Sequence, residues 1–127
     1  MRQVNSAASL RGGSYSHAVV DGDHVYLAGQ VAADRPDPPP LGDIEVETRT
    51  CMELIQAVLG ELGLTFADVL RVGVFMTDLG EFERMDRVYA SFLPVGHAPA
   101  RTTVGVATIL FGCRIEIDCV ARIRTPA

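Results

Sequence analysis

The sequence predicts an α+β fold of two layers, in which two helices pack on one face of a mixed β-sheet. Two amphipathic segments, residues 43–63 and 82–92, alternate with segments dense in β-branched residues, in the order ββαβαββ. The 127 residues suit one domain, which we assign to residues 1–127. Apolar residues make up 48% and charged residues 21%, so the composition is globular and excludes a disordered or coiled-coil chain.

The first two strands are expected to form a β-hairpin. Residues 17–31 read HAVVDGDHVYLAGQV, two runs rich in β-branched and aromatic residues around the pair Asp21-Gly22. This pair suits the positive φ angles of a tight turn. The following stretch, DRPDPPP at residues 34–40, is a predicted loop because prolines donate no backbone hydrogen bonds.

The two helices and the strand between them follow in sequence. Asp43 is a good N-cap for the first helix, which is expected to end near Gly63; its apolar stripe is Cys51, Leu54, Ile55, Val58 and Leu62. Residues 68–78, DVLRVGVFMTD, lack a helical stripe and predict a buried strand. The second helix ends before Pro94, and its stripe is Phe82, Met85, Tyr89 and Phe92.

Residues 101–124 contain the last two predicted strands, separated by a loop around residues 108–112. In the last strand Cys113, Ile115, Ile117 and Cys119 share an apolar face, opposite Arg114, Glu116, Asp118 and Val120. If the two strands pair antiparallel through a loop with an even number of residues, for example 108–111, Thr103 lies opposite Glu116 and Arg101 is diagonal to Glu116 on the same face. Small residues beside charges on that face suit a subunit interface that holds a polar pocket.

Arg101 and Glu116 are the strongest candidates for chemistry. A guanidinium offers a fork suited to a carboxylate, and a nearby Glu can orient or deprotonate a water molecule. A plain cross-strand ion pair is the alternative, and spacing alone leaves both open.

Several function classes lack support in the sequence. The net charge is −5 with no basic run, which argues against nucleic acid. No apolar stretch approaches the roughly 18 to 20 residues that cross a bilayer, and residues 1–13 lack the apolar block of a signal peptide, so we expect a cytoplasmic protein. Cys51, Cys113 and Cys119 have no CxxC spacing and are expected in the core. No P-loop, GxGxxG, HExxH or GxSxG motif occurs, so neither a cofactor nor a metal is indicated.

Five short motifs, in order along nearly the whole chain, resemble the YjgF/RidA family of enamine/imine deaminases. They are GSYSHA at residues 13–18, VYLAGQ at 25–30, VFMTD at 74–78, PARTTV at 99–104 and CRIEID at 113–118. Each motif alone is weak, and the combination is specific. The resemblance implies a chorismate mutase-like fold, a homotrimer with active sites in the clefts between subunits, and no cofactor.

The resemblance also implies a reaction and roles for residues. The family hydrolyses reactive 2-imino acids and 2-aminoacrylate to 2-keto acids and ammonia. By position, Arg101 would bind the substrate carboxylate, Glu116 would position the attacking water and Tyr15 would lend its hydroxyl. The backbone around Gly29 would line the pocket, and Thr103 occupies a site where relatives often carry a small residue.

Four departures from the family pattern bear on the pocket. Ser14 replaces a proline, Ala28 replaces a serine, and residues 109–112 are more apolar than the usual loop. Asp86 stands where an asparagine is common, and a carboxylate facing the cleft would disfavour anionic substrates. Two alternatives therefore stay open: a non-catalytic trimeric protein that binds a small carboxylate, and, for Tyr15, a packing role at the hairpin edge.

Overall fold

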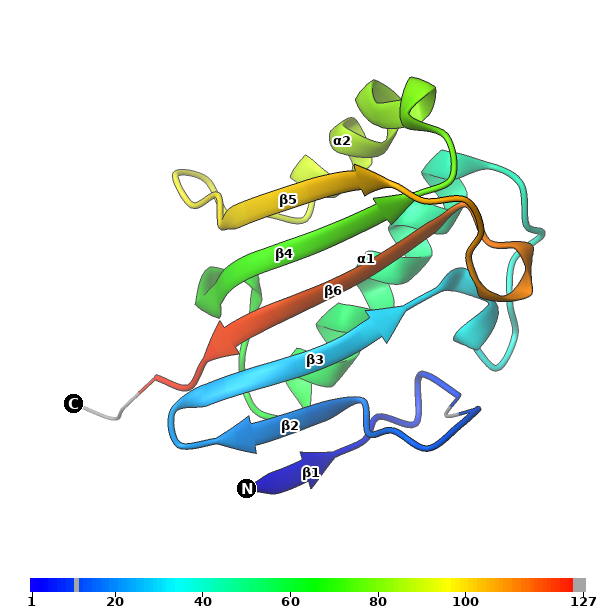
Figure 1. The fold of residues 1–127 in the computed structure, drawn as a ribbon. Helices are drawn as coiled ribbons and strands as arrows, with labels where there is room; N and C mark the ends of the chain where they lie inside the picture. Colours follow the sequence, from blue (N-terminus) through cyan, green and yellow to red (C-terminus); the bar gives the residue numbers. More distant parts are fainter. Residues whose placement is uncertain (11, 125–127) are drawn as a thin grey trace.

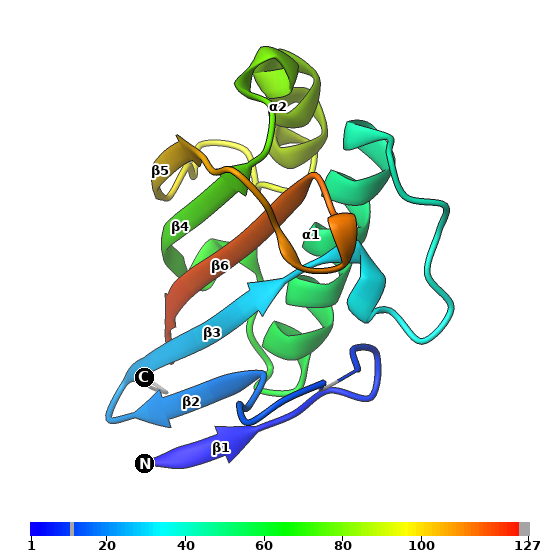
Figure 2. The same cartoon turned by 45° about the vertical axis from the view of Figure 1, so that its right-hand side comes forward.

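The computed structural model describes residues 1–10 and 12–124, in which a six-stranded sheet is covered on one face by two helices (Figures 1 and 2). The strands lie in the order β1-β2-β3-β6-β4-β5, and only β4 and β5 run parallel. Their bounds are Arg2–Val4 (β1), Ala18–Asp21 (β2), His24–Gln30 (β3), Val69–Met76 (β4), Ala100–Gly105 (β5) and Ile115–Arg122 (β6). The predicted two-layer α+β class is confirmed, and β1 is an additional strand that pairs with β2.

The predicted hairpin is present as β2 and β3, with its turn one residue later than expected. Asp21 pairs with His24, so the two turn residues are Gly22 and Asp23. Gly22 has a φ of 63°, a conformation that glycine adopts without steric cost. The sequence therefore predicts a tight turn that includes Gly22. The exact position of the turn is set by the register in which β2 and β3 pair.

Both predicted helices form, and each is shorter at its C-terminal end than the sequence pattern indicates. Helix α1 covers Ile44–Gly60, and the side chain of Asp43 accepts hydrogen bonds from the backbone N–H groups of Glu45 and Val46, as an N-cap does. Helix α2 covers Phe82–Ala90. The core between helices and sheet includes Ile55, Leu59, Val74, Met85, Ile115 and Ile117, all at most 1% exposed.

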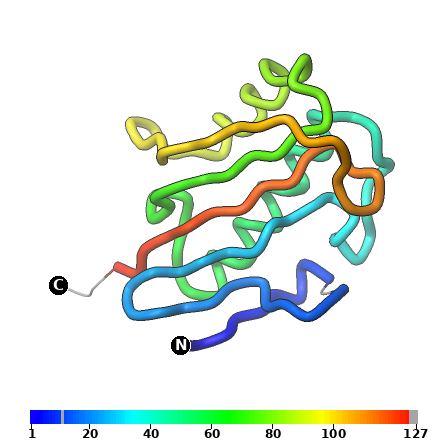
Figure 3. Tube along the Cα trace, viewed as in Figure 1, coloured from blue at the N-terminus to red at the C-terminus, as the bar shows by residue number. Residues whose placement is uncertain are grey.

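The predicted pairing between the last two strands is wrong, because β4 lies between β5 and β6. A helix between two strands returns the chain to its starting end, so β4, α2 and β5 form a crossover unit with parallel strands. Figure 3 shows the chain then passing beyond the end of β4 to reach β6. This segment, residues 106–114, includes the short helix η4 at Leu110–Gly112.

The sheet face away from the helices carries the polar and half-buried side chains of β3, β4 and β6. Among the described residues, none of the helices is both long and apolar enough to cross a membrane.

Candidate functional site

Arg101 and Glu116 do not meet within one chain, contrary to the prediction from strand pairing. Phe75 on β4 is the register partner of both Val104 and Glu116, so these three side chains share the open face of the sheet. Arg101 precedes Val104 by three residues and therefore faces the helix layer. The predicted site residues consequently form two separate groups, one on each face of the sheet.

The first group lines a cavity of about 400 Å³ on the open face, which we call the acidic cavity. Its lining residues are Gly12, Gly13, Tyr15, Ala28, Gly29, Val31, Asp34, Leu110, Phe111 and Glu116. Tyr15, Gly29 and Glu116 are predicted site residues, and the structure brings all three together. The remaining lining is mostly apolar, so the two carboxyl groups dominate its chemistry.

Glu116 lies directly over the backbone of Gly29. A Cβ atom at position 29 would be 2.2 Å from Glu116 Oε2, so only glycine allows this carboxyl position. A glycine inside a strand often marks such a close approach. Because residue 29 has no side chain, strand β3 leaves room for the Glu116 carboxyl group in the cavity.

Burial raises the pKa of Glu116, and the negative charges of Asp118 and Asp34 raise it further. The sequence left open whether burial or a neighbouring arginine dominates at Glu116. Within one chain burial dominates, because Arg101 faces away. Burial likewise raises the pKa of Asp34. A carboxyl group with a raised pKa is the better general base at neutral pH.

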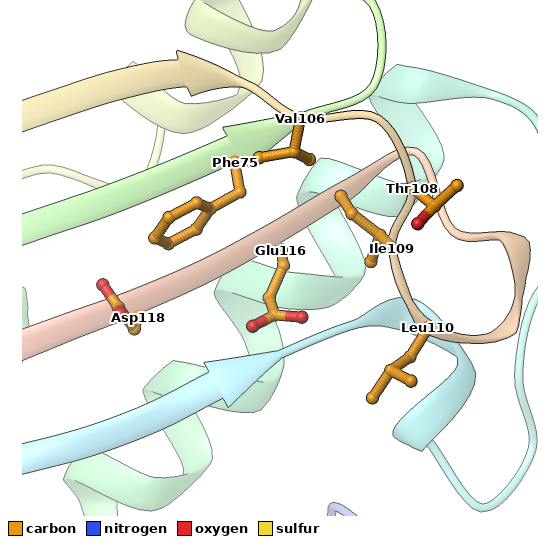
Figure 4. A pocket seen from close by; sticks show the side chains of 7 residues that line it. All are labelled: Phe75, Val106, Thr108, Ile109, Leu110, Glu116 and Asp118. Carbon is orange, nitrogen blue, oxygen red and sulfur yellow. The ribbon is translucent and has the colours of Figure 1, made fainter.

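A second cavity, of about 410 Å³, adjoins the first across Glu116 (Figure 4). Its lining is Phe75, Val106, Thr108, Ile109, Leu110, Glu116 and Asp118. In Figure 4, Glu116 lies between Asp118 and the apolar side chains of the loop after β5. Glu116 can thus be approached from both cavities.

The second group of predicted residues surrounds Arg101 on the helix side, and we call Phe82, Asp86, Tyr89 and Arg101 the arginine cluster. Arg101 Nη1 donates to Asp86 Oδ1 over 2.5 Å. The guanidinium carbon lies 5.2 Å from the ring centre of Phe82 and 4.8 Å from that of Tyr89, both within cation–π range. Thr103 shares this face of β5, two residues along the strand.

The structure adds functional residues that the sequence pattern did not single out. Asp34 was expected in a loop, and it lines the acidic cavity at 8% exposure. Phe82 and Tyr89 were identified only as a core stripe, and their rings also hold Arg101. Phe82 and Tyr89 are seven residues apart on one helix, with Asp86 between them. This spacing places all three side chains on one helix face, and it could have indicated that they contact the same residue.

Tyr15 lies between the acidic cavity and a buried histidine. It lines the acidic cavity, and its ring centre lies 6.3 Å from that of the buried His17. His17 in turn accepts from the Ser6 N–H at Nδ1, and its Nε2 lies 3.2 Å from the Leu10 carbonyl oxygen. The ring of His17 therefore supports the segment that carries Tyr15.

Among residues 1–10 and 12–124, no group of three or more His, Cys, Asp or Glu side chains is arranged to hold a metal ion. The polar side chains gathered in the two groups are the carboxyl groups of Asp34, Asp86 and Glu116, the phenol groups of Tyr15 and Tyr89, and the guanidinium of Arg101.

Comparison with known proteins assigns the family. The profile of the family described as "Endoribonuclease L-PSP" matches residues 6–123. The chain belongs to this family, which is the YjgF/RidA family. DfrA of Myxococcus xanthus is 40% identical over 112 residues, covering 86% of this chain and 85% of that protein.

Solved structures agree with this assignment. A candidate endoribonuclease from Thermotoga maritima superposes with a TM-score of 0.90 at 32% identity, covering 98% of this chain and 99% of that one. RidA from an Antarctic Psychrobacter gives 0.89 at 27% identity, covering 97% and 100%. The resemblance inferred from the five motifs is thereby confirmed at the level of family and fold.

Proposed function

We propose that this protein hydrolyses reactive 2-imino acids and their 2-aminoacrylate-type enamine tautomers to 2-keto acids and ammonia. The observation that carries the proposal is Glu116, a half-buried carboxyl group with a raised pKa, in a cavity that Tyr15 also lines. Imines of this kind already react with water. The protein therefore needs to orient the substrate, supply a fixed positive charge and relay a proton.

The proposal includes a homotrimer in which each active site draws on two subunits. Within one chain, Arg101 and Glu116 face opposite sides of the sheet. Arg101 lies on the edge strand β5 and its side chain is 22% exposed, so a second copy of the chain can reach it. In the proposed cleft, Arg101 of one subunit faces the acidic cavity of its neighbour.

The proposed mechanism balances with one water molecule. Arg101 binds the substrate carboxylate through its fork of N–H donors. Glu116 takes a proton from water as the water oxygen bonds to C2 of the imine, and it passes this proton to the nitrogen, which gives a carbinolamine. Glu116 then takes the proton of the new hydroxyl group and delivers it to the nitrogen, so that the C2=O double bond forms as the C2–N bond breaks and ammonia leaves. Tyr15 donates a hydrogen bond to the nitrogen. A 2-keto acid remains, and no other reactant is consumed.

The decay of 2-iminopropionate, generated in situ by an amino-acid oxidase, tests the proposal. Wild type should accelerate this decay, and Arg101→Ala should not, at unchanged oligomer size by light scattering. Bulkier imines should be included, because Leu110 and Phe111 leave an apolar wall in the acidic cavity. If wild type accelerates the decay of none of these imines, the deaminase proposal is wrong.

A non-catalytic protein of the same fold that binds small carboxylates is the second candidate. The apolar wall of Leu110 and Phe111 beside Glu116 favours it, because it departs from the family's usual loop at residues 109–112. Binding of a carboxylate without faster imine decay would support this candidate. RNA is the weaker choice despite the family's name, since the net charge is −5 and the cavity is acidic.

A further inference from the structure

We propose that Asp86 makes the Arg101 site selective for zwitterionic ligands, which carry a positive nitrogen beside the carboxylate, over simple carboxylate anions. The inference rests on the proposed function in one respect, the assignment of Arg101 as the carboxylate-binding group. It adds the charge state of the substrate: the protonated 2-imino acid, in which an iminium nitrogen is bonded to the carbon next to the carboxylate.

A carboxylate already occupies part of the Arg101 guanidinium. Asp86 Oδ1 accepts from Arg101 Nη1 at 2.5 Å, and Asp86 is the only acceptor that Arg101's side chain has among the described residues. A guanidinium has five N–H donors. Several donors are therefore left for a ligand, which would lie on the same cation as Asp86.

Two aromatic rings on the helix that carries Asp86 hold Arg101 beside it. Phe82, Asp86 and Tyr89 recur along α2 at steps of four and three residues, so they share one face of the helix. Both rings lie against the guanidinium, which restrains Arg101 beside Asp86. A ligand therefore meets the ion pair and does not displace it by a simple rotation of the arginine.

The Tyr89 hydroxyl is buried and has no hydrogen-bond partner among the described residues. Burial raises the pKa of Tyr89. The positive charge of Arg101 lowers this pKa and the negative charge of Asp86 raises it, so the Tyr89 hydroxyl is electrostatically coupled to both members of the ion pair. A buried hydroxyl without a partner is rare in folded proteins. The Tyr89 hydroxyl is thus left with open hydrogen-bonding capacity, which a ligand oxygen bound at Arg101 would fill.

Charge balance then decides the ligand class. A simple anion on Arg101 would put two carboxylates on one cation, and like charges at short distance repel. In a 2-iminium acid the positive nitrogen is attached to the carbon next to the carboxylate. The iminium nitrogen can therefore lie near the Asp86 carboxylate while the ligand's carboxylate contacts Arg101. Each negative charge then has a positive charge beside it. The protonated imine is also the form that water attacks most readily, so the same residue selects the reactive species.

A pair of matched ligands tests the proposal without turnover. L-Alanine and L-lactate differ in an ammonium group against a hydroxyl group, and their Kd values can be measured by calorimetry on the intact wild-type protein. We expect alanine to bind about tenfold more tightly or better, the range of one charge-assisted hydrogen bond. In Asp86→Asn this preference should fall to within about twofold, mainly because lactate gains affinity.

Glu83→Gln is the matched control, because Glu83 is an exposed acid on the same helix and the substitution removes the same charge. It should leave both Kd values unchanged. If Asp86→Asn unfolds, as judged by circular dichroism, Asp86→Ala takes its place, and Asp86→Glu should keep the preference.

Three results would overturn the proposal: equal binding of both ligands by wild type, failure of wild type to bind alanine, or an unchanged preference in Asp86→Asn. None of these depends on catalysis. A protein that prefers alanine and leaves imines untouched would refute the deaminase activity and keep the role of Asp86.

Discussion

Arg101 and Glu116 face opposite sides of the same sheet, and strand β4 separates the strands that carry them. Each residue is nevertheless prepared for chemistry in its own surroundings. Arg101 is held by two aromatic rings and Asp86, and Glu116 lies over Gly29 in the acidic cavity. One chain thus carries two halves of the proposed site.

Mixing two inactive variants should restore activity. Arg101→Ala lacks the carboxylate-binding group, and Glu116→Gln lacks the base, so each alone should be inactive in the imine assay. In randomly mixed trimers about one quarter of the clefts combine an intact Arg101 with an intact Glu116, because the two come from different subunits. We therefore expect about one quarter of wild-type activity after co-refolding in equal amounts.

The control for this experiment is the double variant Arg101→Ala/Glu116→Gln mixed with either single variant, which should stay inactive. Native mass spectrometry establishes that mixed trimers form. Mixed trimers without any recovered activity would contradict a site shared between subunits.

Gly29→Ala should lower activity at least tenfold at little cost in stability. The new Cβ would lie 2.2 Å from Glu116 Oε2, so the carboxyl group must move out of its position. We expect imine turnover to fall at least tenfold, the usual effect of a misplaced general base, and the free energy of unfolding to change by about 1 kcal/mol. Steady-state kinetics and urea unfolding measure the two quantities.

Gly60→Ala is the matched control for Gly29→Ala. Gly60 ends α1, and a Cβ there meets nothing within 4 Å. Activity should stay at the wild-type level, and stability should rise by roughly 0.5 kcal/mol because alanine favours the helix. Equal activity of Gly29→Ala and Gly60→Ala would show that the close approach of Glu116 to Gly29 has no role in turnover.

Glu116→Gln should stabilise the protein at neutral pH while it abolishes turnover. Burial raises the pKa of Glu116 above its ordinary value of 4.5, so the folded state binds the proton more tightly than the unfolded chain does. Wild-type stability therefore falls as the pH rises from about 4.5 through the folded pKa, and glutamine removes this loss. The gain at pH 7 should be no more than about 1 kcal/mol, because the carboxyl group is only half buried.

Thermal unfolding of wild type and Glu116→Gln at pH 4 and pH 7 checks this sign. The difference in Tm should be positive at pH 7 and shrink toward pH 4. A Glu116→Gln variant that is less stable than wild type at pH 7 would mean that the ionised carboxylate is stabilised in the fold.

Glu47→Ala should destabilise the fold by about 3 kcal/mol. Glu47 is fully buried, and its two carboxyl oxygens accept the backbone N–H groups of Gly42 and Arg114, both at 2.8 Å. Its removal leaves two partly buried backbone donors without partners. Glu53→Ala on the same helix removes only an exposed pair with Arg35 at 3.7 Å, and should cost at most about 0.5 kcal/mol. Urea unfolding that finds equal costs for both variants would contradict this assignment.

The three cysteines should resist alkylation in the native protein. Cys51, Cys113 and Cys119 are all buried, and burial raises the pKa of the Cys119 thiol to about 12. At pH 8 only about one Cys119 thiol in ten thousand is then ionised. Mass spectrometry after iodoacetamide treatment should find no label natively and three labels in guanidinium. Rapid native labelling of Cys119 would mean that β6 opens.

The local elements could be read from the sequence because each depends on neighbouring residues. The N-cap at Asp43, the turn at Gly22 and the apolar stripe of Cys51, Ile55 and Val58 are set by contacts within one element, and the structure contains each of them. The five short motifs and their order along the chain also indicated the family. Arg101, Glu116, Tyr15 and Gly29 were identified in this way.

Strand order could not be read in the same manner. Antiparallel pairing of β5 with β6 satisfies the alternation of Cys113, Ile115 and Ile117 as well as the observed order does, because alternation says which side chains share a face and nothing of which strand lies beside it. The crossover through α2 decides the order by returning the chain parallel to β4.

By itself the sequence determined the two-layer class, the positions of both helices and the candidate site residues, because periodicity and short motifs are local properties. Only the tertiary structure decided that Arg101 pairs with Asp86 on the helix side, and that Glu116 lies over Gly29 on the other. These contacts join residues far apart in the chain through the packing of β4 between β5 and β6. The burial that raises the pKa of Glu116 is a product of that packing, and so is the division of the site into two halves.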